Sequence, residues 1–322
     1  MKIFITRKIP KEGLKLLEKH HEIEINPHDR ILNKQEILKG IKDKDGLLCL
    51  LTDNIDKDII NSEPKLKMIS NYAVGFNNID IKVATKRKIP VSNTPGVLTD
   101  ATAEMAWALL FSVARRIVEA DKFTRDKEFK GWDPMLMHGQ GVTNKTLGII
   151  GAGRIGTAFA LKSKGFEMNV LYTSNKRSSV LEKNLNARKV ELTYLLKNSD
   201  FVSIHVPLNE STHHLIGETE LKMMKKTAIL INTSRGPVVC EKALIKSLKN
   251  KWIFGAGLDV YEFEPEVNEE LIKLDNVVLQ PHSASATSES RTNMAIMAAE
   301  NMISGLKGEK PPNCVNSKIF DQ

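Results

Sequence analysis

The sequence is poor in the residues that build disulfide-rich, zinc-binding or membrane proteins. Its three cysteines, Cys49, Cys240 and Cys314, are odd in number, scattered and without a C-x-x-C spacing. A disulfide framework and a cysteine zinc site are therefore not expected. No apolar run approaches the roughly 20 residues of a membrane span, and the N-terminal apolar stretch is too short for a secretory signal. We therefore expect a cytoplasmic protein.

The charge of the chain is moderately positive. Its 47 Lys and Arg residues outnumber its 39 Asp and Glu residues, which gives a formal net charge of +8 over 322 residues. An excess of this kind can indicate nucleic-acid binding. Here the lysines are spread through the whole sequence among acidic residues, so we expect a solvated surface and no nucleic-acid partner. A mildly positive field also suits anionic small molecules such as carboxylates and phosphates.

The first hundred residues alternate short apolar runs with amphipathic stretches. This βαβ rhythm predicts a parallel sheet, and it contains no glycine fingerprint. The expected strands are "KIFIT" (Lys2–Thr6), "EIEIN", "GLLCLLT" (Gly46–Thr52), "LKMISNYAVG" and "IPVSNTPG".

The rest of the chain predicts a second unit of the same class. A stretch without Gly or Pro, Thr99–Phe123, is expected to be one long connecting helix. From Thr146 the rhythm restarts with six strand candidates, and a last amphipathic helix from about Ser288 to Leu306 is long enough to pack on the first unit. We expect an α/β protein with one domain at 1–99 plus 288–322 and another at 100–287. The six candidates are "TLGII", "MNVLYT", "DFVSIHVP", "AILINTS", "GAGLDV" and "NVVLQPH".

The stretch "LGIIGAGRIGTAFA" places three glycines on a strand-to-helix turn, the context that a dinucleotide-binding motif needs. Gly151 would allow the tight turn, Gly153 the approach of a pyrophosphate, and Gly156 close packing of the helix on the strand. Ala152, Arg154 and Ile155 complete the turn, whose helix N-terminus attracts phosphates. A glycine-rich turn without a ligand is the alternative.

The end of the next strand predicts which dinucleotide binds. An acidic residue there would accept hydrogen bonds from the ribose 2′-OH of NAD(H), but Tyr172–Ser179 contains neither Asp nor Glu. Small polar and basic side chains suit a 2′-phosphate, so we predict NADP(H), with NAD(H) as the alternative. The residues concerned are Ser174, Asn175, Lys176 and Arg177.

Three reactive side chains follow later strand candidates. Arg235, Glu264 and His282 each come shortly after an apolar run. Ligands collect at the carboxyl ends of parallel strands, so the three residues could converge on a bound nicotinamide. An Arg can grip a carboxylate, and a His backed by a carboxylate can act as a general acid.

At this point the chain resembles the D-isomer-specific 2-hydroxyacid dehydrogenase family, above all its glyoxylate/hydroxypyruvate reductase branch. The resemblance implies two doubly wound parallel-sheet domains, a Rossmann cofactor domain inserted into a flavodoxin-like substrate domain, with the active site in the cleft between them. The motifs, which cover nearly the whole chain, are "AVGFNNID", "SNTPGVLTDATAE", "FKGWDP", "KTLGIIGAGRIG", "HVPLNESTHHLI", "LINTSRGPVVCEKAL", "GAGLDVYEFEP" and "VVLQPHSASAT".

The resemblance also implies residue roles. The activity would be reduction of a small 2-oxo acid, with Arg235 and His282 binding substrate and His282 acting as general acid beside Glu264. The family works without metal and forms homodimers, here through Thr99–Phe123 and the loop carrying Trp132. Further substrate contacts would be Leu51, Val74, Gly75 and Trp132, and further cofactor contacts Thr102, Val206, Pro207, Thr233 and Asp259. Plain packing is the alternative for each of these.

Some features leave alternatives open. Ser283 and Ala284 replace a glycine-containing form common in the family, so the hydrogen bonds after His282 stay open at this point. Asn175 stands where some NADP-using relatives have Arg. D-lactate, phosphoglycerate or 2-ketogluconate chemistry are the rival activities, and a dinucleotide-sensing co-repressor is the rival from another class.

Overall fold

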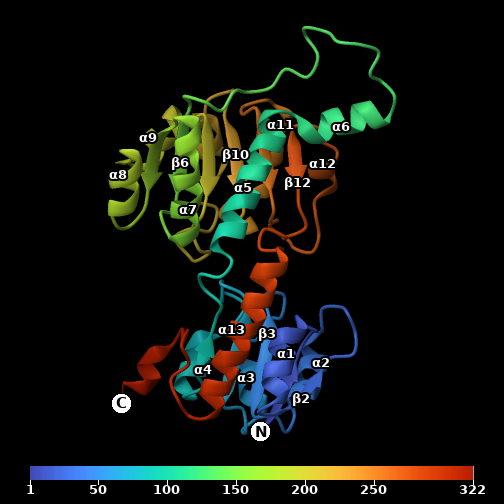
Figure 1. Cartoon of the computed structure of the whole chain (residues 1–322), viewed down its shortest axis with the longest axis vertical. Helices are drawn as coiled ribbons and strands as arrows, with labels where there is room; N and C mark the ends of the chain where they lie inside the picture. Colours follow the sequence, from blue (N-terminus) through green and yellow to red (C-terminus); the bar gives the residue numbers. More distant parts are fainter. Residues whose placement is uncertain (322) are drawn as a thin grey trace. The chain divides into compact units, whose positions relative to one another are not determined.

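The structure, a computed structural model, describes residues 1–321. The chain forms two compact units, Met1–Leu98 together with the chain from Ala286 onward, and Thr99–Ser285. Each unit has its own parallel sheet, as Figure 1 shows. Among residues 1–321, no helix has both the length and the apolar character that crossing a bilayer requires.

The sheet of the first unit has five strands in the order β2-β1-β3-β4-β5. All of its strand pairs are parallel. This is the flavodoxin-like order, and it confirms the expected fold class of the first unit. The strands are β1 (Lys2–Ile5), β2 (Glu22–Ile25), β3 (Gly46–Leu50), β4 (Met68–Tyr72) and β5 (Val91–Ser92).

Helices cover the first sheet. The last long helix, α13, packs against α1 and β4, as its length and amphipathic pattern predicted. A hydrogen bond from the Ser70 hydroxyl to the Ala298 carbonyl, 2.9 Å long, ties it to the sheet. The helices are α1 (Lys11–Glu18), α2 (Lys34–Ile41), α3 (Lys57–Ser62), α4 (Ile81–Lys86), α13 (Ser288–Leu306) and the 3₁₀ turn η3 (Ser317–Phe320).

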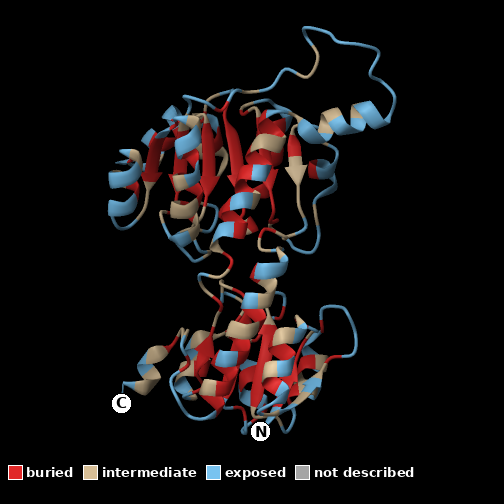
Figure 2. Ribbon diagram, viewed as in Figure 1, coloured by how far each residue is buried: buried red, intermediate tan, exposed pale blue. Residues whose placement is uncertain are grey.

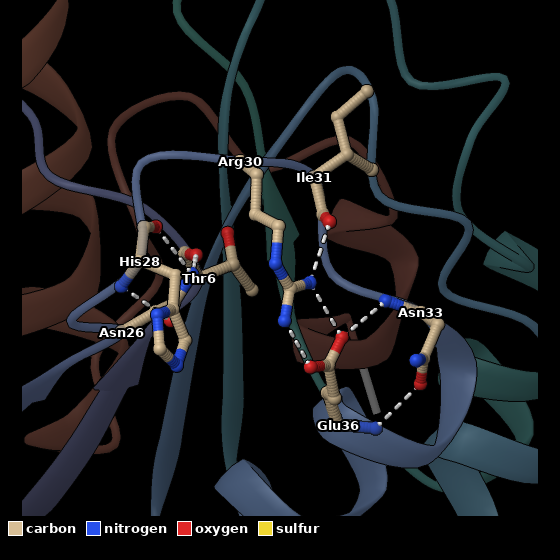
Figure 3. Close-up of polar contacts among 7 residues, drawn as sticks. All are labelled: Thr6, Asn26, His28, Arg30, Ile31, Asn33 and Glu36. Carbon is tan, nitrogen blue, oxygen red and sulfur yellow. Dashed lines mark hydrogen bonds and ion pairs between the residues drawn. The ribbon is translucent and has the colours of Figure 1, made fainter.

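Polar contacts organise the loop that follows β2, which Figure 3 shows. Asn26 donates to the carbonyls of Thr6 and His28 at 2.9 Å each. Asn33 and Glu36 then form a reciprocal capping box that begins α2. The Arg30 guanidinium holds both carboxylate oxygens of Glu36, and these contacts lower the pKa of Glu36 to about 2.

The sheet of the second unit has seven parallel strands in the order β12-β11-β10-β9-β6-β7-β8. Counted from β6, this is the Rossmann order 3-2-1-4-5-6 with one added edge strand. The six predicted strands are confirmed, and the sequence missed the two-residue strand β8. The strands are β6 (Thr146–Ile150), β7 (Asn169–Thr173), β8 (Arg188–Lys189), β9 (Phe201–Ile204), β10 (Ile229–Asn232), β11 (Gly255–Leu258) and β12 (Val277–Leu279).

Helices flank this second sheet on both faces (Figure 1). They begin with α5, which contacts α7, β10 and β11. The helices are α5 (Thr99–Ala114), α6 (Ile117–Arg125), α7 (Arg154–Lys162), α8 (Ser179–Leu185), α9 (Leu192–Asn198), α10 (Glu218–Met223), α11 (Glu241–Lys249) and α12 (Glu269–Ile272), with the 3₁₀ turns η1 (Ser163–Phe166) and η2 (Gly236–Val238).

The expectation of one long helix over Thr99–Phe123 is wrong. The chain breaks between α5 and α6 at Arg116, whose φ of +52° lies in the left-handed region. Helix α5 contributes a row of buried residues to the core, whereas α6 has no buried residue among those described. The sequence could not show this break because "ARRIVE" contains neither Gly nor Pro, the residues that usually end a helix.

The interior of the second unit is apolar on both sides of its sheet. Figure 2 shows most of the strands as buried, while most helices expose one face. On one side the indole of Trp107 packs against the Phe159 ring at a centroid distance of 4.9 Å. The indole N–H also donates to the Phe159 carbonyl at 2.9 Å. This core fixes α5 and α7 on the sheet, and with them the turn between β6 and α7.

Candidate functional site

The candidate catalytic residues lie at the carboxyl ends of three neighbouring strands. Strands β10, β11 and β12 pair side by side, and each is followed within a few residues by Arg235, Glu264 or His282. Because these three strands are neighbours and parallel, Arg235, Glu264 and His282 all follow the same edge of the second sheet.

A hydrogen bond joins His282 to Glu264. The Nδ1 atom of His282 lies 2.8 Å from Oε2 of Glu264, and the two side chains are 24% and 29% exposed. The other oxygen, Oε1, accepts from the Tyr261 amide at 3.0 Å. Burial acts most strongly on the pKa of Glu264 and raises it, but the hydrogen bonds from His282 and the Tyr261 amide, together with neighbouring positive charge, outweigh burial and leave this pKa below its usual value. The carboxylate is thus ionised at neutral pH and orients the imidazole, with Nε2 as the atom that can exchange a proton with a ligand.

The backbone after β12 holds His282 in an uncommon conformation. Its φ of +52° lies in the left-handed region, where non-glycine residues cluster at functional sites. The next two amides, of Ser283 and Ala284, both donate to the buried Asp259 carboxylate, at 2.7 Å and 2.9 Å. Burial raises the pKa of Asp259, and these two bonds oppose that effect. The side chain of Asp259 therefore anchors the loop that carries His282.

Arg235 lies in the loop after β10, where its Nη1 donates to the Ser234 carbonyl at 2.8 Å. Asn232 shapes this loop: its amide donates to the Arg235 carbonyl at 3.0 Å and its oxygen accepts from the Ser234 amide at 3.0 Å. Burial lowers the pKa of Arg235, while the Glu264 carboxylate raises it. The guanidinium keeps its charge at neutral pH, because an arginine pKa begins far above 7. The site thus holds a fixed cation beside the His282–Glu264 pair.

The glycine turn after β6 has the shape expected for a dinucleotide. Gly151 has a φ of +100°, and a β-carbon there would lie 2.8 Å from the His205 carbonyl. A β-carbon at Gly156 would lie 2.0 Å from the Gly151 carbonyl oxygen, so only glycine fits at both positions. At Gly153, by contrast, a β-carbon would meet nothing within 4 Å. This open position lies at the N-terminus of α7, where Ala152, Arg154 and Ile155 complete the turn.

The remaining predicted cofactor residues lie around the same edge of the second sheet. Val206 and Pro207 follow β9, and Thr102 lies in the first turn of α5. Thr233 follows β10 and is 8% exposed, and its hydroxyl has no hydrogen-bond partner within residues 1–321. A buried hydroxyl without a partner and the open cradle at Gly153 both fit a bound dinucleotide.

Ser174, Asn175, Lys176 and Arg177 follow β7, as expected. The sequence stretch contains no acidic residue, but the structure brings Glu182 from α8 back to it, 3.1 Å from Nε of Arg177. Sequence reasoning missed this carboxylate. Ser178 is a typical N-cap residue, and that signal would have placed Glu182 in the first turn of the next helix.

The predicted substrate residues of the first unit lie at the carboxyl edge of its own sheet. Val74 and Gly75 follow β4, and their carbonyls accept from the Asn93 and Asn71 amides at 2.8 Å each. Leu51 follows β3, and Asn78 holds that turn through the Leu50 carbonyl at 3.0 Å.

Trp132 and the pair His213–His214 lie on loops of the second unit, after α6 and after β9. Trp132 is 85% exposed on the long loop after α6. His214 lies 2.7 Å from the Glu262 carboxylate, and its ring stacks on His213 at 4.0 Å. In the part of the chain that the structure describes, no group of three His, Cys, Asp or Glu side chains could hold a metal.

Replacing Asp259 by Asn tests whether this buried carboxylate holds the His282 loop. An amide can accept one of the two backbone N–H groups but would turn its own N–H₂ toward the other. We expect the free energy of unfolding to fall by about 1–3 kcal/mol, measured by urea denaturation. The matched exposed variant Asp275→Asn should change it by no more than about 0.5 kcal/mol. Equal stability of both variants would show that Asp259 does not anchor the loop.

Known proteins resemble this chain over its full length. The family described as "D-isomer specific 2-hydroxyacid dehydrogenase, NAD binding domain" matches residues 107–284. A glyoxylate reductase of Thermococcus litoralis is 54% identical, covering 99% of this chain and 98% of the relative. A glyoxylate reductase of Pyrococcus horikoshii is 51% identical, with 99% and 97% covered.

Solved structures agree with these relatives. A Thermus thermophilus protein has a TM-score of 0.91 at 39% identity, covering 98% of this chain and all of that chain. An NADPH-dependent glyoxylate/hydroxypyruvate reductase of Sinorhizobium meliloti, solved with NADP and malonate, has a TM-score of 0.87 at 27% identity, with 98% and 97% covered. With the Rossmann and flavodoxin-like sheets and the glycine turn, these matches settle the family: the chain belongs to the D-isomer-specific 2-hydroxyacid dehydrogenases, enzymes that use NAD(P).

Proposed function

We propose that this enzyme reduces a small 2-oxo acid, glyoxylate or hydroxypyruvate, to the D-2-hydroxy acid with NAD(P)H. The observation that carries the proposal is the 2.8 Å bond between His282 and Glu264, with the Arg235 charge beside it, on the sheet that carries the glycine turn. The names of the relatives, glyoxylate reductase and glyoxylate/hydroxypyruvate reductase, support the choice of substrate.

Each side chain has a chemical task in this reaction. The reduced nicotinamide, when bound, supplies a hydride to C2 of the oxo acid. Arg235 binds the substrate carboxylate and C2 oxygen through its planar fork. His282 donates a proton from Nε2 to that oxygen as its negative charge develops, and Glu264 stabilises the imidazolium before transfer. In the reverse direction the same imidazole removes the hydroxyl proton.

Other residues bind the two ligands. The glycine turn binds the pyrophosphate through backbone N–H groups, and the Thr233 hydroxyl finds its partner in the cofactor. Thr102, Val206, Pro207 and Asp259 complete the cofactor contacts in this proposal. On the substrate side, backbone N–H groups of Val74 and Gly75 meet the carboxylate, while Leu51 and Trp132 limit the pocket to small oxo acids.

The proposal includes a homodimer. The segment from α6 through the following loop exposes large apolar side chains, which monomeric proteins seldom gather in one place. A second copy of the chain would cover them, and Trp132 would then enter the partner's pocket. The exposed residues are Ile117, Val118, Phe129, Trp132 and Met135.

Removing the proposed acid should abolish most turnover. We expect His282→Ala to lower kcat for glyoxylate by about 10²- to 10⁴-fold with cofactor affinity little changed. Arg235→Ala should raise KM for the oxo acid and lower kcat, because the carboxylate loses its counter-charge. The exposed histidine variant His28→Ala serves as the control. Unchanged turnover in His282→Ala would refute the mechanism.

A substrate panel in the same assay separates the rival activities, with nicotinamide absorbance as the readout. Preferred turnover of D-lactate-, phosphoglycerate- or ketogluconate-type substrates would assign another branch of the family. Tight dinucleotide binding without turnover of any 2-oxo acid would favour a co-repressor-like binding protein.

The residues after β7 predict a preference for NADP(H). We expect kcat/KM with NADPH to exceed that with NADH by about tenfold, the effect of one charge-assisted hydrogen bond. Ser174→Asp should reverse the preference, because a carboxylate there accepts from the ribose 2′-OH and repels a 2′-phosphate. A strong NADH preference of the unaltered enzyme would contradict this assignment.

The exposed apolar side chains of α6 and the following loop predict a dimer that depends on apolar contacts. Phe129→Ser combined with Met135→Ser should convert a dimer to a monomer in size-exclusion chromatography with light scattering. The exposed variant Ile272→Ser, on the same unit, should remain dimeric. A monomeric unaltered protein at micromolar concentration would contradict the proposed assembly.

A further inference from the structure

A chain of hydrogen bonds runs from the core of the second unit to Arg177. It begins at Tyr172 in β7, whose side chain is fully buried. The Tyr172 hydroxyl donates to Oε1 of Glu182 at 2.5 Å and accepts from the Ser178 amide at 3.0 Å. Because the ring is fixed by packing within the sheet, its hydroxyl is a fixed point at the end of the strand.

Glu182 links the fixed Tyr172 hydroxyl to the Arg177 side chain. The same Oε1 atom accepts from Nε of Arg177 at 3.1 Å. Ser178 caps helix α8 through its hydroxyl, so Glu182 lies in the first turn, where a negative charge is favoured. Hydrogen bonds from Tyr172 and Arg177 hold the pKa of Glu182 below its usual value. It is therefore an ionised acceptor at neutral pH.

The contact of Glu182 with Nε determines which N–H groups of Arg177 can bind a ligand. Glu182 accepts from the Nε–H group of the guanidinium. The two Nη groups at the other end of the guanidinium can then bind a phosphate through two parallel hydrogen bonds. The Arg177 side chain is 74% exposed, so without such a contact it would sample many rotamers. Ordering it before the ligand arrives lowers the entropy that binding costs.

We propose that Tyr172 and Glu182 are positioning residues for cofactor selection, which hold Arg177 ready for the 2′-phosphate of NADP(H). The inference deepens the proposed function and rests on its NADP(H) preference. Neither residue touches the phosphate itself; both act through Arg177.

A competing effect of Glu182 has the opposite sign, because its negative charge repels a phosphate. Salt does not remove this repulsion, because a phosphate on the far edge of Arg177 would lie well within the screening length of about 8–10 Å. The Arg177 guanidinium lies between the two anions, however, and offsets the Glu182 charge through the contact at Nε. Lys176 follows the same strand, and Lys189, whose Nζ lies 3.3 Å from the Asn175 carbonyl, adds further positive charge. Positioning should therefore outweigh repulsion, and the sign of the effect is measurable.

The test measures equilibrium dissociation constants of NADPH and NADH by quenching of protein fluorescence, without substrate. Tyr172→Phe removes the anchoring hydroxyl without changing any charge, and Glu182→Ala removes the acceptor. Each should weaken NADPH binding by about three- to tenfold, the effect of one lost hydrogen bond, and NADH binding by less than about twofold. Glu182→Gln keeps an acceptor oxygen and should retain more NADPH affinity than Glu182→Ala. Glu191→Ala, an exposed carboxylate of the same unit, is the matched control.

A double-mutant cycle then tests whether the effect passes through Arg177. Arg177→Ala should weaken NADPH binding selectively, and adding Glu182→Ala to it should change NADPH affinity by less than about twofold. The NADH constant of each preparation reports correct folding. If Tyr172→Phe is unstable, the Glu182 variants complete the test.

The outcomes separate this inference from the proposed function. Weaker NADPH binding in Arg177→Ala, with unchanged or stronger binding in Glu182→Ala, would overturn the positioning role alone. Unchanged NADPH binding in Arg177→Ala would overturn both the positioning role and the assignment of the 2′-phosphate to this loop. A loss of NADPH affinity on adding Glu182→Ala to Arg177→Ala would contradict the positioning role, because the effect of Glu182 would then not pass through Arg177.

Discussion

The hydrogen bond between His282 and Glu264 is the contact on which the proposed chemistry depends. A lone imidazole on a loop has no fixed orientation. The carboxylate 2.8 Å away fixes the orientation of the His282 ring, and it is itself held by the Tyr261 amide. The buried Asp259 fixes the backbone on the far side of the histidine. Hydrogen bonds to the backbone thus hold both the loop that carries Glu264 and the loop that carries His282.

The order of strands in the second sheet explains why residues so distant in sequence can act together. Neighbouring parallel strands end at one edge, so the loops after β10, β11 and β12 are adjacent without any special long connection. The same edge carries the glycine turn after β6 and the basic loop after β7. One sheet edge therefore holds the glycine turn, the buried Thr233 hydroxyl, the Arg235 guanidinium and the His282–Glu264 pair, the groups on which the proposed reduction of an oxo acid depends.

The sequence predicted what depends on local pattern. Apolar runs located the strands, and the amphipathic period located α13. It failed where the outcome depends on contacts distant in the chain. The break at Arg116 follows from a buried α5 and an exposed α6, and strand β8 is too short to leave a pattern. The βαβ rhythm predicted a parallel sheet in each unit, whereas the Rossmann and flavodoxin-like types of the two sheets were implied by the family resemblance.

The candidate site shows the same division. Residue types at strand ends indicated Arg235, Glu264 and His282, and the structure joins two of them by a hydrogen bond. No local pattern could show that the Asp259 carboxylate binds the amides after His282, because the two segments are 24 residues apart. Glu182 was missed because helix α8 folds back onto the loop that the sequence showed to be free of acids.

The rate of glyoxylate reduction by Glu264→Gln tests the central claim most directly. Glutamine keeps the size of the side chain and can still accept from Nδ1, but it removes the negative charge that faces the imidazole. We predict a kcat at least about tenfold lower, with the dissociation constant of the cofactor and thermal unfolding unchanged. A kcat equal to that of the unaltered enzyme would contradict the account.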